Sequence, residues 1–229
     1  MNKLTTLIAS LAVATMSFAS TANSIEYKLG VTGQSTAYYA NVQETLKKTT
    51  STAGARVTNE EAIAAFNYAS VFAELAFDEV YGLTIGLEYT PESIALKTET
   101  RQIAVAVTGE GDADGGIQKV GGSVDDLMMI YAAMPIMGSN FYVKAGYGTA
   151  SLMTKESLAS GSSYKDEDLE MVTVGAGYDM DIGSMAFLRV EAMYNQFDDI
   201  VLTGSQEDEV LTGSFNKVKA ELGGVAAKL

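Results

Sequence analysis

A two-residue alternation recurs along this chain, with its charges on the unusual side for a water-soluble sheet. Between Tyr81 and Tyr89 the odd positions hold tyrosine, leucine and isoleucine, whereas the even positions hold glycine, threonine and Glu88. This period is that of a β-strand. A soluble sheet turns its apolar face to a core and its charges to water. A single closed sheet in lipid does the reverse, so the pattern predicts an all-β transmembrane barrel.

Eight segments carry the alternation, and we expect each to form an antiparallel strand of one up-and-down barrel. Long polar connections alternate with short turns, which is typical of outer-membrane barrels with short periplasmic turns and long extracellular loops. The first connection, Asn41–Glu61, is long and places both termini on the periplasmic side. Gln102–Val107 is a candidate extra strand, so ten strands is the alternative to eight. The expected strands are Ile25–Gly33, Ala65–Phe77, Tyr81–Thr90, Asp125–Met134, Phe141–Ser151, Met171–Met180, Ala186–Phe197 and Phe215–Ala227.

The first 22 residues have the features of a secretory signal. Lys3 precedes the apolar stretch Leu4–Phe18, and either Ser17-Phe18-Ala19 or Ser20-Thr21-Ala22 fits the residues that precede a cleavage site. We therefore expect a signal peptide at 1–22 and one domain at 23–229. The longest later apolar run, Leu127–Met137, is far shorter than the roughly 20 residues of a transmembrane helix.

Composition excludes several classes of function. The net charge of −14 argues against a nucleic-acid partner, and the absence of cysteine excludes disulfides and an N-terminal lipid anchor. The absence of histidine removes the commonest general base and zinc ligand. We expect no enzymatic activity, no cofactor and no metal site. Asp112 and Asp114 resemble the start of a calcium loop without the downstream glutamate, and we interpret them as an acidic turn.

The polar strand faces collect charged residues that we expect in the lumen. An eight-stranded barrel is only wide enough for side chains to fill it, so these charges are expected to pair as a structural network. Glycines such as Gly86 and Gly177 on the same face leave room for long neighbours. An ion pathway lined by the same residues is the alternative. The candidates are Glu26, Lys28, Glu74, Glu88, Lys144, Arg189, Glu191, Lys219 and Glu221.

Signal sequence, strand rhythm and face chemistry together resemble the small outer-membrane β-barrels of Gram-negative bacteria, the OmpA-like and opacity-type barrels often grouped as a porin family. The resemblance implies insertion by the barrel-assembly machinery into outer-membrane lipid and lipopolysaccharide. We expect a monomer, because no exposed motif argues for more. It departs at the C-terminus, where the family usually ends in an aromatic residue and this chain ends in Leu229.

The role that we expect is structural or surface-interacting, with a narrow lumen plugged by charges. A small diffusion pore is the first alternative. A soluble secreted β-barrel that binds an apolar ligand is the second. It requires an apolar interior, with Glu74, Glu88, Lys144 and Arg189 outside.

Overall fold

The computed structural model describes residues 16–19, 25–46, 56–96, 98–103, 116–136, 138–158, 163–183, 185–207 and 215–229. Within these ranges the chain is all β apart from one 3₁₀ turn, η1 (Asp78–Val80). No helix there is long and apolar enough to cross a membrane.

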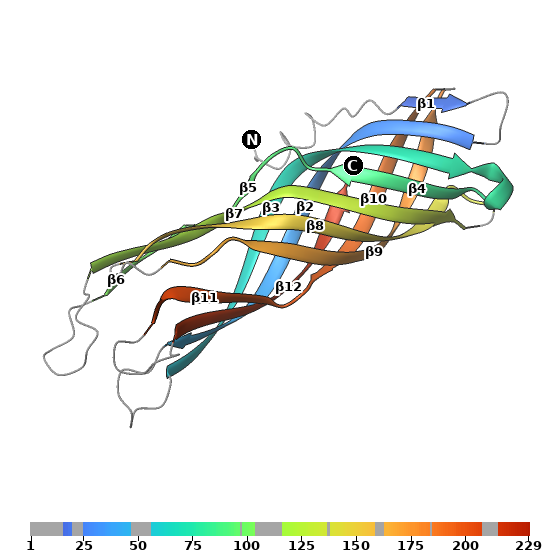
Figure 1. Ribbon diagram of the computed structural model, residues 1–229. Helices are drawn as coiled ribbons and strands as arrows, with labels where there is room; N and C mark the ends of the chain where they lie inside the picture. The colour runs from blue at the N-terminus through green and yellow to red at the C-terminus, as the bar shows by residue number, and fades with distance from the viewer. Residues whose placement is uncertain are drawn as a thin grey trace, which may run out of the picture.

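Eight antiparallel strands form a closed ring (Figure 1). Each pairs with its neighbours in sequence, and the last strand pairs with the first, from Lys217 opposite Thr45 to Lys228 opposite Gln34. The predicted all-β antiparallel fold with eight strands is therefore confirmed. The ring strands are β2 (Ile25–Leu46), β3 (Arg56–Phe77), β4 (Leu83–Tyr89), β7 (Gly116–Pro135), β8 (Phe141–Ser157), β9 (Glu167–Ile182), β10 (Ala186–Phe197) and β12 (Phe215–Lys228).

Four shorter strands extend this ring without adding to its strand number. β5 (Ile94–Ala95) and β6 (Glu99–Ile103) follow β4 and pair with β7. β11 (Ile200–Glu207) follows β10 and pairs with β12. β1 (Met16–Ala19) lies in the predicted signal sequence and pairs with β2. β6 overlaps the predicted Gln102–Val107 strand, of which residues 104–107 lie outside the described ranges.

Several strands are longer than the alternation predicts. The polar stretch Asn41–Glu61, expected as a connection, continues β2 to Leu46 and begins β3 at Arg56. Likewise β7 begins at Gly116, well before the predicted Asp125. Such polar segments still satisfy their main-chain groups by strand pairing, so an apolar face is not needed for them to continue as strands.

The chemistry of the two faces reverses along the strands. At the end that carries the short turns, which we call the short-turn end, β2 turns Tyr27 and Leu29 outward and Lys28 inward. At the opposite, long-connection end, the same strand exposes Asn41 and turns Ala40 toward Leu222 of β12. The inner face is thus charged at the short-turn end and apolar at the long-connection end.

The ring opens between β3 and β4 toward the long-connection end. The β3–β4 ladder stops at Val71 opposite Tyr89, and the next hydrogen-bonding position on β4 is Pro91, which has no N–H to donate. From there the chain follows β7, with Thr90 N donating to Leu127 O at 2.9 Å. In the described residues, Figure 1 accordingly shows β6, β7 and β8 diverging from β3, β2, β12 and β11.

Candidate functional site in the lumen

Arg189 of β10 joins two carboxylates across the lumen. Its guanidinium donates to Glu74 of β3 through Nη1 and Nη2. On its other side it donates to Asp179 of β9 through Nε and Nη2, both at 2.8 Å. Tyr131 of β7 completes the group by donating its hydroxyl to Glu74 at 2.6 Å. The planar guanidinium suits this double bidentate arrangement, which an ammonium could not make.

In a second group, acidic and basic side chains contact one another in alternation. Lys144 of β8 donates to Glu191 of β10 at 3.0 and 3.2 Å and lies 3.7 Å from Glu88 of β4. Lys228 of β12 donates to both oxygens of Glu88, at 2.8 and 3.0 Å. Ser70 also donates to Glu88, at 2.7 Å. Because all these side chains are buried, each charge depends on its partners for the solvation that water would give it.

Two tyrosines hold the charged groups in place and lie over glycines. Tyr142 donates its hydroxyl to Glu191 at 2.7 Å. Its ring occupies the space where a side chain on Gly177 would be, and Tyr131 lies in the same way over Gly86. The predicted role of the lumen glycines is therefore refined: these two make room for tyrosine rings that carry the hydrogen bonds.

The lumen is filled on both sides of these groups. At the short-turn end, half-buried Lys28 lies 3.8 Å from Glu26 and 4.0 Å from Asp179. Toward the long-connection end, Thr173 donates to Asn195 at 2.8 Å. Beyond them lies a cluster of buried apolar side chains. This apolar cluster includes Tyr38, Tyr68, Ile94, Leu127, Met129, Leu169, Met171, Phe197 and Ile200.

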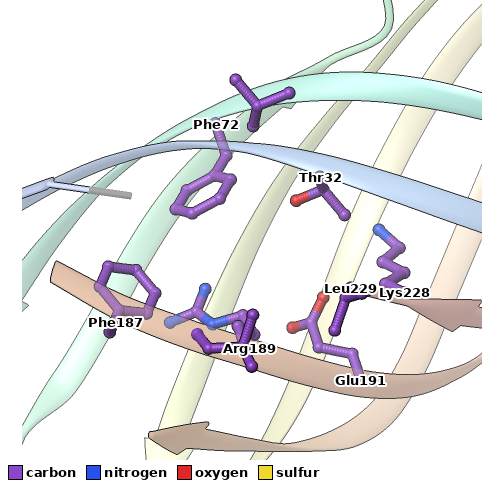
Figure 2. A pocket seen from close by; sticks show the side chains of 9 residues that line it. Thr32, Phe72, Phe187, Arg189, Glu191, Lys228 and Leu229 are labelled. Atoms are coloured by element: carbon purple, nitrogen blue, oxygen red, sulfur yellow. The ribbon is translucent and has the colours of Figure 1, made fainter. Parts of the chain in front are cut away.

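Two small cavities lie beside the charged groups. One, about 20 Å³, lies between the second charged group and the apolar cluster, next to Glu88 and Lys228. The other, about 10 Å³, lies between Arg189, Phe187 and Lys228, and Figure 2 shows these side chains converging on it. Spaces of this size hold one or two water molecules.

The structure brings seven of the nine predicted charges to the inner face. Five of them form the two buried groups, and Glu26 and Lys28 lie at the short-turn end. The placement of Lys219 and Glu221 in the lumen was wrong. Both lie on the outer face of β12, where Lys219 is 45% exposed and pairs with Asp199 at 2.8 Å.

The reversal of the two faces explains this error. The prediction assumed that the apolar face of the last strand points outward along its whole length. At the long-connection end the apolar residues Val218, Ala220 and Leu222 instead point inward, and the latter two pack against the apolar cluster. An outer surface in water needs charges, so Lys219 there is in its ordinary place.

Four side chains of the two charged groups were missed. Lys228 shares the parity of Ala226 on β12 and was overlooked because that face was assigned to the outside. Asp179 continues the inward alternation of β9, and this signal could have found it. Tyr131 and Tyr142 also have inward parity, but tyrosine on a strand carries no charge that would mark it as a lumen residue.

The described residues contain no group of three or more acidic, histidine or cysteine side chains suited to a metal ion. The Asp112 and Asp114 motif lies outside the described ranges. The aspartates at 166 and 168 are described but exposed, and Asp166 accepts a hydrogen bond from Thr154 N at 2.8 Å.

No protein-family model and no curated protein matches this chain. Among solved structures, it is similar to Ail, the attachment invasion locus protein of Yersinia pestis, in complex with the heparin analogue sucrose octasulfate. The identity is 10%, 87% of this chain and 99% of Ail are covered, and the TM-score is 0.29. A FadL homologue of Pseudomonas aeruginosa is 12% identical over 94% of this chain and 66% of its own, with a TM-score of 0.30. At such TM-scores the fold rests on the strand pairing of this chain itself.

Proposed function

We propose that this chain is a small outer-membrane β-barrel with a closed lumen, whose role lies in its outer surface and in the structure of the envelope rather than in transport or catalysis. One observation carries the proposal: the outer face is apolar at the same level at which the inner face holds buried ion pairs. On β8, exposed Phe141, Val143 and Tyr147 alternate with buried Tyr142 and Lys144.

We call the exposed apolar side chains at this level the apolar belt, which on β8 runs from Phe141 to Thr149. Its height fits a bilayer. The nine residues from Phe141 to Thr149, at about 3.4 Å per residue and a tilt of about 40°, rise about 20 Å. Transmembrane barrels carry an apolar band about 25 Å tall. Aromatic residues lie at both of its edges, with Phe141 against Tyr178 at one end and Tyr147 and Tyr194 toward the other. Interfacial aromatic belts have this placement.

The side chains that fill the lumen favour a closed barrel rather than a diffusion pore. Arg189, Tyr131 and Tyr142 lie across the interior, and Arg189 approaches the rings of Phe72 and Phe187 at 5.4 and 5.1 Å. Neither of the two small cavities beside the charged groups has room for a hydrated ion. A soluble barrel for an apolar ligand is opposed by the inward position of Glu74 and Lys144, which that alternative places outside.

Further parts of the proposal follow from the location. The proposal includes export through the signal peptide at 1–22 and insertion by the barrel-assembly machinery. It also includes contact with lipopolysaccharide, a monomeric state and similarity to the OmpA-like and opacity-type barrels. The absence of histidine supports a non-enzymatic role, because general acid–base chemistry near neutral pH most often uses this residue.

Fluorescence tests the location directly, because the chain contains no tryptophan. A Val143→Trp variant is folded into vesicles, and emission is compared between ordinary lipids and lipids brominated in the acyl chains. We expect strong quenching of Val143→Trp and little quenching of Ile63→Trp, which lies beyond the belt. Equal quenching of both would contradict the belt.

Conductance in a planar bilayer tests the closed lumen. We expect no ion conductance from the folded protein, whereas regular conductance steps would favour the pore.

A further inference from the structure

The part of β3 beyond its ladder with β4 is an open sheet edge. Residues 56–70 of β3 pair with β2 on one side, and no described strand pairs with them on the other. This is the consequence of Pro91, where the neighbouring chain leaves β3 and follows β7. Such an edge presents unpaired N–H and C=O groups and is a template for another strand.

The pairing pattern shows which residues face the open side. Phe77 O accepts from Gly82 N in the turn to β4, so odd residues of β3 direct their main-chain groups toward β4. Thr90 N bonds to β7 instead, which leaves odd Tyr89 pointing toward Val71 and agrees with this assignment. The β2–β3 register runs without a shift, so the same parity holds from Val71 to Val57.

The side chains along this edge define the chemistry of a partner. Ile63, at the middle of the open stretch, is 84% exposed, and Val57 is 51% exposed. Glu60 and Glu61 are exposed on opposite faces of the strand. An added strand would therefore gain contact with apolar side chains while meeting negative charge on both of its faces.

We propose that this edge of β3 binds an extended, basic segment of another protein by β-strand addition. The main chain of the segment pairs with Val57 to Ala65, and its lysine or arginine side chains lie beside Glu60 and Glu61. Main-chain bonds give such complexes their affinity and the flanking side chains give their specificity. The inference rests on the proposed function, because the edge faces the outside of the cell only when the apolar belt lies in the outer membrane.

A second copy of the chain fits the edge less well. The two strands of an antiparallel pair are related by a two-fold axis perpendicular to both strands. A rotation about this axis would turn one barrel upside down relative to the other. Copies in one membrane share their orientation, so they cannot pair their β3 edges in this way. A separate segment has no such constraint.

The experiment measures binding of a dye-labelled synthetic peptide, in which valine and threonine alternate with lysine, to the full chain folded in lipid nanodiscs. Binding that weakens as salt is raised is expected, because charge attraction contributes. A peptide of the same pattern with glutamate in place of lysine should not bind. Equal binding of both peptides, or no binding of the lysine peptide, would overturn the proposal.

Two variants at one position separate the main chain from the side chain. Ile63→Pro removes an outward N–H and, because odd residues face away from β2, breaks no β2–β3 hydrogen bond. We expect at least about tenfold weaker binding for Ile63→Pro than for Ile63→Ala, which keeps the N–H. Identical affinities for these two variants would show that the edge is not used.

A change on the peptide covers the case in which Ile63→Pro does not fold. Methylation of alternate peptide nitrogens removes its donors while the wild-type barrel is unchanged, and this should also abolish binding. Heat-dependent migration in SDS gels and Val143→Trp quenching are recorded on the same preparations. A barrel that is folded in lipid but binds no peptide would overturn this inference alone, whereas failure of quenching would overturn the proposed function.

Discussion

Lys228 Nζ lies 2.8 Å from Glu88 Oε1, although 140 positions separate the two residues in the sequence. The contact joins the last ring strand, β12, to β4 across the lumen. Both side chains are about 6% exposed. An ion pair buried this deeply leaves a costly isolated charge when one partner is lost, and this makes its contribution measurable.

Replacement of Lys228 by methionine is expected to destabilise the folded barrel by about 3–5 kcal/mol, because Glu88 then keeps only Ser70 and the more distant Lys144. Urea unfolding in detergent micelles, followed by the gel mobility shift, measures the loss. Lys219→Met on the outer face is the matched control, with an expected change below about 0.5 kcal/mol. Adding Glu88→Gln to Lys228→Met should recover part of the lost stability. A double variant that is less stable than either single variant would contradict the pairing.

Arg189→Lys should destabilise the barrel although the charge is kept. A lysine cannot donate in parallel to Glu74 and Asp179, so one buried carboxylate loses its partner, at an expected cost of about 2–4 kcal/mol. The same unfolding measurement tests this expectation. Lys217→Arg at the exposed end of β12 is the reciprocal control. Wild-type stability of Arg189→Lys would mean that the double bidentate contact contributes nothing.

Gly177→Val should be destabilising through steric conflict with the ring of Tyr142. Overpacking of this kind costs about 1–3 kcal/mol. Ala176→Val, one position away on the outer face, introduces the same valine side chain without the conflict and should have little effect. The combination of Gly177→Val with Tyr142→Ala tests the cause, since removal of the ring should lessen the penalty of the valine. An undiminished penalty would assign it to the backbone instead.

A plugged lumen predicts that conductance can be created by deletion. Replacement of Arg189 and Tyr142 together by alanine removes two side chains that lie across the interior, and ion conductance should appear in planar bilayers where the wild-type protein is silent. The measurement requires protein shown to be folded by its gel mobility. The outer-face variant Tyr147→Ala should stay silent. Conductance of the wild-type protein equal to that of the double variant would exclude the plug.

The apolar belt predicts a strong dependence on position for a new charge. Ala145→Arg should cost about 2–4 kcal/mol, because this outer-face position lies at the middle of the belt and the arginine would face hydrocarbon. Ile63→Arg should be close to neutral, since Ile63 lies outside the belt in water. Refolding yield into vesicles and urea unfolding report both values. Similar losses at the two positions would argue that the belt does not face lipid.

The sequence predicts the ring well and its far end poorly, for one physical reason. Alternation identifies strands wherever one face is apolar, and β10 was predicted at Ala186–Phe197 with both of its observed bounds. Where both faces are polar, as in the outer part of β2 and β3, the strand continues without a signal. The alternation does not show which solvent surrounds each part of a strand. For this reason the prediction placed Lys219 in the lumen and omitted Lys228, because the apolar face of β12 points inward at the long-connection end.

The pairing of β12 with β2 also bears on how the chain folds. Hydrogen bonding between the first and last ring strands brings together residues nearly two hundred positions apart, such as Gln34 and Lys228. Contacts of this separation slow folding, because a long loop must close before they give any stability. Glu88 therefore pairs with Lys228 only when the ring closes. Closure of the ring and full neutralisation of the interior therefore occur together, and partly closed forms, in which Glu88 lacks its closest cation, are disfavoured.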